Sequence, residues 1–310
     1  TAGFTANLGL KYDNVDMTVD YNVNRGGSQG SQDIKKSYFL PALNLRYNLN
    51  DKHSLRFGAS KTYTLPQSKE ISPFRYVSVS FNSQGNPDLK PSDNYNVDLK
   101  WDWYISPSEL LSVTGFYKYI KNPISRIEIA SAGGFLSYEN IADHATAAGV
   151  EVELKKHLFS HPLQGDGLNR LTLGVNGAYT YTCAKVPLAT DPSGSQLEGA
   201  APWIVNADLT YLYRKGTSSL TAALVFNYFS DRIYTIGTEG YQDIIENGIP
   251  TLDFVGTAKL GKHFSVNLKA RNLLNSTHQL TRKGSGNDSE VVLSKYRKGV
   301  DLSIGLAYNL

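Results

Sequence analysis

The chain has 310 residues, of which 41% are hydrophobic, and its mean hydropathy is −0.31. No apolar run reaches the roughly 18 residues that a transmembrane helix needs, which excludes a membrane protein built from helices. The 31 basic and 28 acidic residues nearly balance, so net charge gives no support for nucleic-acid binding, and the single Cys183 excludes an intrachain disulfide framework.

Apolar and polar residues alternate for about ten residues at a time along nearly the whole chain, which predicts strands. The first two strands are expected near 3–12 and 14–23, joined by a tight Asp13-Asn14 turn. Later strands are expected in pairs joined by short turns of Asn, Asp, Gly, Ser or Pro, at 38–49 and 53–65, 94–105 and 110–121, 203–214 and 218–230, and 251–260 and 263–274. The pair at 145–156 and 169–183 is expected to meet across a longer connection that contains Gly165, Asp166 and Gly167. A final strand is expected near 297–310.

Residues 94–105 show the pattern most clearly. One face of this strand carries Tyr95, Val97, Leu99, Trp101, Trp103 and Ile105, and the other carries mainly polar residues, with Tyr104 as the exception. A ribbon with one apolar and one polar side is what a wall between lipid and water requires. The sequence therefore predicts an all-β, transmembrane antiparallel β-barrel.

The remaining connections are long, at roughly 24–37, 66–93, 122–144, 184–202, 231–250 and 275–296, and a short hairpin is expected at 125–130 and 134–140. Strict alternation of short and long connections is typical of barrels with periplasmic turns and extracellular loops. We count about thirteen membrane strands, and an odd number places Thr1 on the outer side and the C-terminus on the periplasmic side. A complete barrel has an even number, so we expect a portion of a longer protein.

Three stretches resemble the C-terminal part of the barrel of a TonB-dependent outer-membrane receptor. The first is Gly85-Asn86-Pro87-Asp88-Leu89-Lys90-Pro91, which resembles a loop-to-strand motif of that family. The second is Ala270-Arg271-Asn272-Leu273-Leu274-Asn275, and the third is the amphipathic last strand, which ends in Leu310 where the family usually has Phe. Pro87 and Pro91 are expected to stiffen the return of the loop into the wall, because Pro cannot donate to a ladder.

The resemblance implies a barrel of 22 strands with an N-terminal plug inside it. Residues 1–310 would then be the C-terminal portion, strands ten to twenty-two, without the plug domain and the N-terminal strands. The implied partners are the lipid of the cell outer membrane, the protein's own plug domain, the TonB energising complex acting through the missing N-terminal part, and an extracellular nutrient. No nucleic-acid partner, cofactor or metal is expected.

The function implied is capture and TonB-dependent import of a scarce nutrient, namely a siderophore, haem, cobalamin or a glycan. A passive porin-like channel and a surface adhesin barrel are the alternatives. The sequence contains no array of catalytic residues, so we expect no enzyme.

Two sets of side chains are candidates for function. Aromatic and charged residues are favoured anchors at binding surfaces, and those expected in the outer loops are Arg75, Tyr76, Tyr138, Glu139, Arg232, Tyr241 and His278. Tyr and Phe also form the girdles at membrane interfaces, so that alternative stays open for each aromatic residue. Charged residues expected to face the lumen or the plug are Arg46, Arg56, Asp98, Lys100, Asp102, Asp208 and Arg271.

Overall fold

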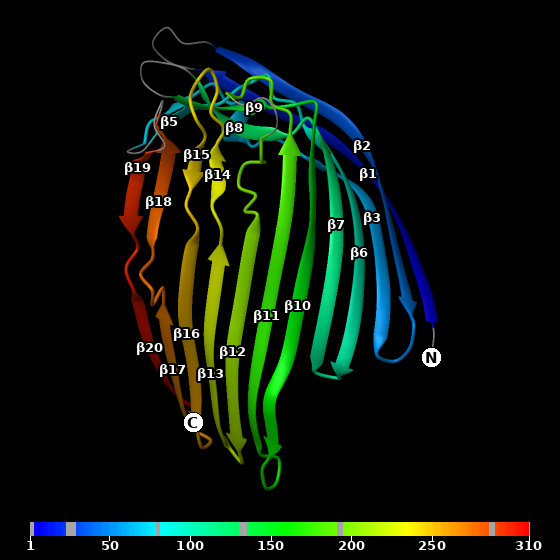
Figure 1. Ribbon diagram of the computed structural model, residues 1–310, viewed down its shortest axis with the longest axis vertical. Coiled ribbons are helices and arrows are strands. Elements are labelled where there is room, and N and C mark those ends of the chain that lie inside the picture. Colours follow the sequence, from blue (N-terminus) through cyan, green and yellow to red (C-terminus); the bar gives the residue numbers. More distant parts are fainter. Residues whose placement is uncertain are drawn as a thin grey trace.

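The main element of the protein is a single antiparallel sheet of twelve strands, seen in a computed structural model that describes residues 3–22, 29–78, 81–129, 135–190, 195–284 and 289–309 (Figure 1). In spatial order the strands are β1 (Gly3–Asn22), β2 (Gln29–Asn48), β3 (His53–Thr64), β6 (Ser92–Ser106), β7 (Glu109–Lys121), β10 (His144–Pro162), β11 (Leu168–Ala184), β12 (Trp203–Lys215), β13 (Ser218–Phe229), β16 (Ile249–Leu260), β17 (Phe264–Arg271) and β20 (Asp301–Tyr308). Short turns lie at one end of the sheet and long connections at the other (Figure 1), which confirms the predicted separation.

Two smaller sheets lie in the long connections. The first contains β4 (Arg75–Tyr76), β5 (Asn82–Gln84), β9 (Phe135–Asn140) and β8 (Ile124–Ile129), and the second contains β14 (Arg232–Thr235), β15 (Ile244–Glu246), β18 (Thr277–Lys283) and β19 (Glu290–Arg297). With the short helix α1 (Ser68–Ile71), these elements form what we call the loop layer. Strands β8 and β9 are antiparallel partners, which confirms the expected hairpin. The described residues include no helix long and apolar enough to cross a membrane.

The two faces of the main sheet differ in polarity along whole rows of the register. One row joins Ser54, Asp102, Ser112, Glu153, Asn176, Asn206, Asn227 and Thr251. The adjacent row, one residue along each strand, joins Leu55, Trp101, Val113, Val152, Gly177, Val205, Tyr228 and Pro250. Asp102 is only 1% exposed, whereas Leu302 on the apolar face is 72% exposed. This inversion of the usual burial rule fits a wall whose apolar face meets lipid.

The first strand differs from the sequence prediction. Residues 3–12 and 14–23 are not two strands joined at Asp13-Asn14, because β1 runs without a break and pairs with β2 from Gly3↔Asn48 to Asn22↔Gln29. Residues 29–37, expected within a loop, belong to β2. The sheet has twelve strands rather than about thirteen, and Gly3 lies at the short-turn end, so the predicted outer position of the first strand's start is wrong.

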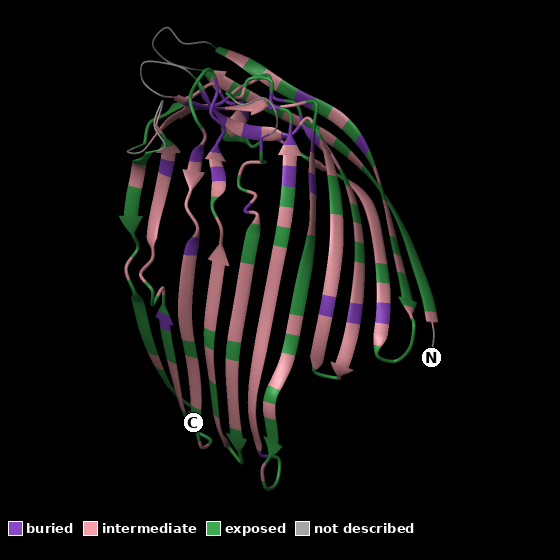
Figure 2. Cartoon of the chain, viewed as in Figure 1, coloured by how far each residue is buried: buried purple, intermediate pink, exposed green. Residues whose placement is uncertain are grey.

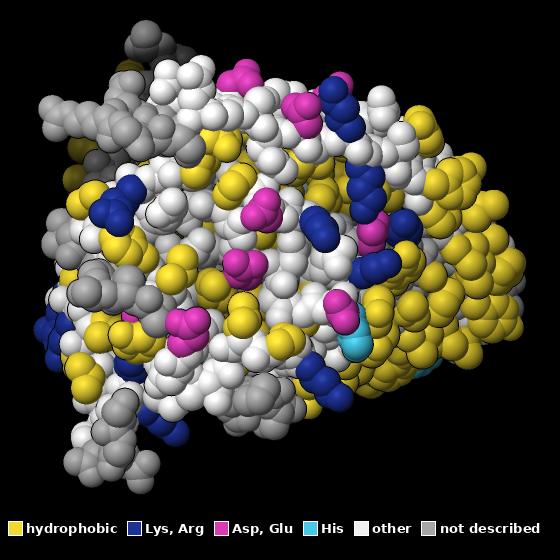
Figure 3. All heavy atoms as spheres, turned by 90° about the horizontal axis from the view of Figure 1, so that it is seen from above, with side chains coloured by type: hydrophobic (Ala, Val, Ile, Leu, Met, Phe, Trp, Pro, Cys, Tyr) yellow, Lys and Arg dark blue, Asp and Glu magenta, His cyan; other side chains and the backbone are white. Residues whose placement is uncertain are grey.

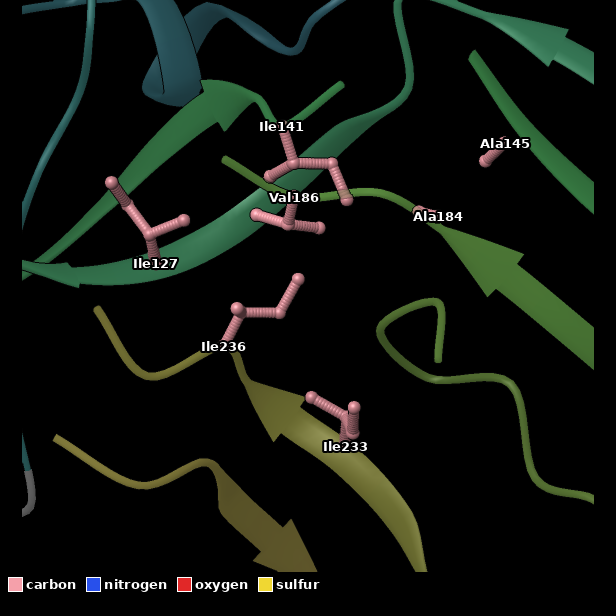
Figure 4. Close-up of a cluster of buried hydrophobic side chains, with 7 residues drawn as sticks. All are labelled: Ile127, Ile141, Ala145, Ala184, Val186, Ile233 and Ile236. Carbon is pink, nitrogen blue, oxygen red and sulfur yellow. The ribbon is translucent and has the colours of Figure 1, made fainter. Parts of the chain in front are cut away.

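A buried apolar cluster joins the loop layer to the ends of β10 and β11. It comes from four separate segments of the chain and consists of Ile127, Ile141, Ala145, Ala184, Val186, Ile233 and Ile236 (Figure 4). Buried residues are concentrated at this end of the molecule (Figure 2). From above, hydrophobic side chains gather on the side of β1 and β2, while charged ones are scattered over the loop layer (Figure 3). The connections are therefore a packed domain rather than separate loops.

Candidate functional site

The polar face of the wall carries a buried carboxylate near its short-turn end. Asp102 accepts a hydrogen bond from Ser54 Oγ at 3.2 Å and lies 3.0 Å from Arg56 Nε and 3.7 Å from Lys100 Nζ. Arg56 also donates to the hydroxyl of Tyr104 at 2.9 Å, which explains why an aromatic residue interrupts the alternation of this strand. A carboxylate removed from water needs such partners.

The register places all seven predicted lumen residues on this polar face. Arg46 is paired with Arg56 across β2 and β3, and Asp98 is paired with Gly58. Asp208 lies opposite Gly174, where an added Cβ would come within 2.1 Å of its Oδ1, and Arg271 lies opposite Asp301. That this face lines a lumen and meets a plug stays a prediction.

The Gly85–Pro91 motif fastens the loop layer to the wall. A Cβ at Gly85 would lie 2.2 Å from the carbonyl oxygen of Ser72, so only glycine allows this approach to α1. The side chain of Asn86 donates to the carbonyl oxygen of Tyr138 at 3.0 Å, and Leu89 is buried. Asn140 accepts from the Lys90 main chain at 2.8 Å. The contacts give the motif a structural role.

The Asn272–Asn275 motif makes a second attachment where β16, β17 and β20 leave the sheet. Asn272 has φ 54°, and its side chain donates to the carbonyl oxygen of Gly299 at 2.7 Å. Its main-chain N–H donates to Asp253 at 2.7 Å, and Gly299 donates back to Asn275 at 3.2 Å. Asn tolerates the left-handed conformation and supplies the bond, so this motif is also structural.

Ion pairs cross the loop layer between distant segments. Glu198 accepts from Ser125 Oγ at 2.9 Å and lies 3.2 Å from Arg126, which packs 4.4 Å from the ring centre of Tyr234. Glu128, which is 6% exposed, pairs with Arg282 of β18. These ion pairs hold the β8–β9 hairpin against the connection between β11 and β12, which carries Glu198, and against the connection between β17 and β20, which carries Arg282.

An aromatic slot lies at the long-connection end of the wall, between β18, β19 and the segment at Phe81. The rings of His278 and Tyr296 are stacked at 4.9 Å with planes 5° apart, and Phe81 lies 6.0 Å from Tyr234. These four residues line a cavity of about 220 Å³ together with Glu246, Gln279, Leu280 and Ser294. We call this cavity the aromatic slot.

The seven predicted loop residues do not form one site. His278 lies in the aromatic slot, and Arg232 reaches it through Glu246, which Arg232 Nε approaches at 2.7 Å. Arg75 packs 3.9 Å from the Phe135 ring centre, and Tyr76 is exposed beside it. Tyr241 lies 5.4 Å from the Arg282 guanidinium carbon. Tyr138 packs against a second buried cluster of Ile34, Ile71 and Leu89.

Glu139 lines a separate groove of about 570 Å³ near Asp88, Lys90, His144 and Lys185. Burial and, second, the nearby Asp88 carboxylate raise the pKa of Glu139 above its ordinary value. In the slot, burial and then Lys298 lower the pKa of His278 below its ordinary value, while Glu246 opposes the change.

Sequence reasoning missed Glu246 and Tyr296 as slot residues. Tyr296 directly faces His278 in the β18–β19 register, so recognising this hairpin within 275–296 would have paired them. Nothing local identifies Glu246, because its neighbours in the slot come from three other segments of the chain. Among the described residues, no group of three His, Cys, Asp or Glu side chains could hold a metal ion.

Comparisons with known proteins agree with the barrel wall described above. A family model described as "TonB dependent receptor-like, beta-barrel" matches residues 1–273. The iron-regulated outer membrane virulence protein of Vibrio cholerae is 23% identical over 297 residues, covering 93% of this chain and 43% of that protein. The chain thus spans less than half the length of this relative.

Two solved structures share the fold at low sequence identity. A ferric enterobactin receptor mutant of Pseudomonas aeruginosa in complex with enterobactin has a TM-score of 0.60 at 17% identity, covering 99% of this chain and 52% of that one. The siderophore receptor PirA of Acinetobacter baumannii has a TM-score of 0.56 at 18% identity, covering 90% and 42%. These likenesses concern the fold alone.

Proposed function

Because the chain belongs to the TonB-dependent receptor-like β-barrel family, we propose that it supplies wall and ligand-binding loops to an outer-membrane importer of a ferric siderophore. Membership in this family confirms the predicted barrel class, the outer-membrane location and a receptor rather than an enzyme. The import activity, the substrate, the plug and the TonB partner belong to the whole protein and are part of the proposal.

The aromatic slot is the observation that carries the choice of substrate. His278 and Tyr296, stacked on each other, line the cavity together with Phe81 and Tyr234, and its volume of about 220 Å³ suits one planar aryl group. Burial and then Lys298 lower the pKa of His278, which favours the uncharged ring for stacking. Relatives named as iron-regulated, ferric enterobactin and siderophore receptors support iron chelates over cobalamin or glycans.

The polar wall supports the transport half of the proposal. Asp102, Arg56 and Lys100 form a charged cluster on the same face as the Asn176, Asn206 and Asn227 ladder. A hydrated or plug-filled interior tolerates such groups, whereas a lipid-facing surface does not. We propose that the protein's own plug packs against this face.

The test uses the full-length protein in a deletion strain under iron limitation. Growth and binding are compared for a ferric aryl siderophore, a ferric hydroxamate, haem and cobalamin. We expect only the aryl siderophore to support growth, and His278→Ala with Tyr296→Ala to weaken its binding roughly tenfold, since each lost ring stack is worth about 0.5–1.5 kcal/mol. The matched control is His263→Ala with Tyr308→Ala, a stacked pair at the short-turn end with ring centres 5.7 Å apart.

Three results would contradict the proposal. Growth restored only by haem, cobalamin or the hydroxamate would show that the substrate is that compound rather than a ferric aryl siderophore. Uptake that continues after the proton motive force is collapsed would favour a passive channel. Surface binding without any uptake would favour an adhesin.

A further inference from the structure

The β1–β2 hairpin leaves the wall halfway along its length. The two strands stay paired to each other as far as Asn22↔Gln29, but β2 pairs with β3 only as far as Ala42↔Ser60. Beyond this point β3 continues to pair with β6 up to Thr64↔Ser92. Figure 1 shows β1 and β2 running past β3 and bending over the loop end.

Pro41 stands at the position where the two strands separate. Pro41 directly precedes Ala42, the β2 residue at which pairing with β3 begins, and it has no N–H to donate to a neighbouring strand. A cavity of about 600 Å³ opens there, lined by Lys11, Leu40, Lys61 and Tyr63 among others. The ladder to β3 therefore ends at a residue that cannot extend it.

The polarity of the hairpin reverses three residues beyond Pro41, at the Asp13↔Tyr38 pair. Below this reversal, even-numbered Leu8, Leu10 and Tyr12 are apolar and exposed. Above it, the even-numbered positions Asn14 to Asp20 are polar and exposed, while the odd-numbered positions from Val15 to Tyr21 are half-buried. The face that meets lipid below thus meets water above, and the opposite face rests on the loop layer.

Among the described residues, only side-chain contacts join the upper half to β3 and β6. Lys36 and Lys61 lie 3.1 and 3.5 Å from Asp93, and Tyr38 stacks on Tyr63 with ring centres 3.8 Å apart. We call Lys36, Tyr38, Lys61, Tyr63 and Asp93 the clasp. Within the described residues, no main-chain hydrogen bond joins the upper half to any other element.

We propose that the upper half of the hairpin, Asp13–Asn22 with Gln29–Tyr38, is a hinged lid that pivots at the Leu10↔Pro41 pair and is held shut by the clasp. Its apolar underside includes Ile34, which packs on Ile71 and Leu89 beside Tyr138. Opening exposes these residues at the outer mouth. Contacts made only by side chains open at lower free energy than the continuous ladders of the wall.

The motion is testable without any ligand, so its failure is separate from that of the proposed function. Spin labels are placed at Ser31→Cys on the lid and Lys262→Cys at the opposite end, in the full-length protein carrying Cys183→Ser in lipid bilayers. Pulsed electron–electron distances are compared with a control pair, Lys185→Cys with Lys262→Cys, whose upper label lies off the lid.

We expect two populations for the lid pair and one for the control pair. Asp93→Asn removes both ion pairs and should raise the displaced population roughly three- to tenfold. The matched Asp88→Asn, a loop-layer carboxylate in no ion pair of the described residues, should leave it unchanged. Pro41→Val restores an N–H and should lower the displaced population by letting the ladder extend.

A single lid distance in all variants would overturn the lid. Equal changes in the distance distributions of the lid pair and the control pair would mean that the whole loop layer moves relative to the wall. An unchanged or larger displaced population in Pro41→Val would overturn the hinge at Pro41.

Discussion

Asp102 in the wall and Ile236 in the loop layer are 1% and 0% exposed, and they are buried for opposite reasons. Asp102 is covered on a polar face while apolar residues such as Leu302 face outward. Ile236 sits in an apolar cluster beneath polar residues, as in a water-soluble domain (Figure 4). One chain therefore shows two opposite burial patterns, and we expect the change between them to mark the membrane boundary on the side of the long connections.

The largest expected effect tests the loop-layer half of this comparison. Ile236→Ala should destabilise the layer by about 2–5 kcal/mol, because a fully buried side chain leaves a cavity. Hydrogen exchange should show lost protection in β8, β14 and their connections. The barrel itself should stay folded, so that heating still changes its migration in gel electrophoresis. Ile129→Ala, at a position 42% exposed, is the control and should change little.

A charge placed on the apolar face tests the wall half. Leu99→Arg should destabilise the barrel by about 2–4 kcal/mol, since arginine near the bilayer midplane is penalised by that amount. Asn96→Arg on the polar face of the same strand is the control. Equal losses of stability in urea titrations of the bilayer-inserted protein would mean that the two faces do not differ in environment.

The attachment between the two regions should contribute less. Asn272→Ala loses one hydrogen bond and places alanine at φ 54°, for a total of about 1–2 kcal/mol. Asn272→Gly keeps the conformation and should lose only part of this. If glycine were as damaging as alanine in thermal unfolding, the left-handed conformation would not matter.

The ion pairs of the loop layer should contribute least. Glu198→Gln should lower protection of the β8–β9 hairpin by under about 1 kcal/mol, because both partners are partly exposed. The difference from the unsubstituted protein should shrink in high salt. A loss that salt leaves unchanged would indicate that the hydrogen bond from Ser125, rather than the charge, is what matters.

A pH titration sharpens the description of the slot. The folded protein disfavours protonated His278. The contribution of His278 to the free energy of unfolding is therefore present above the ordinary pKa of 6.5 and is lost as pH falls through the lowered pKa. Imidazole NMR signals should show His278 titrating below an ordinary histidine. Titration at or above pH 6.5 would contradict the burial of this ring in the slot.

The period-two alternation was enough to predict the wall, because each strand interacts with lipid and polar interior through its own side chains. The β8–β9 hairpin also follows from local sequence, whereas the stiffening role of Pro87 and Pro91 stays a prediction. The loop-layer core could not be predicted, since Ile127 meets Ile236 across more than a hundred residues. At Asp13 the polarity pattern changes phase, which predicts a turn, but the strand continues and only its solvent changes.

The most direct test of the two burial patterns is a spin-label accessibility scan along β1 from Leu8 to Val19, in the full-length, bilayer-inserted protein carrying Cys183→Ser. The account predicts oxygen accessibility that peaks at positions 8, 10 and 12, and then water-soluble nickel accessibility that peaks at 14, 16 and 18. The same face of one continuous strand would thus pass from lipid to water. Loss of the two-residue period at 13 and 14, or water accessibility at 8 and 10, would contradict it.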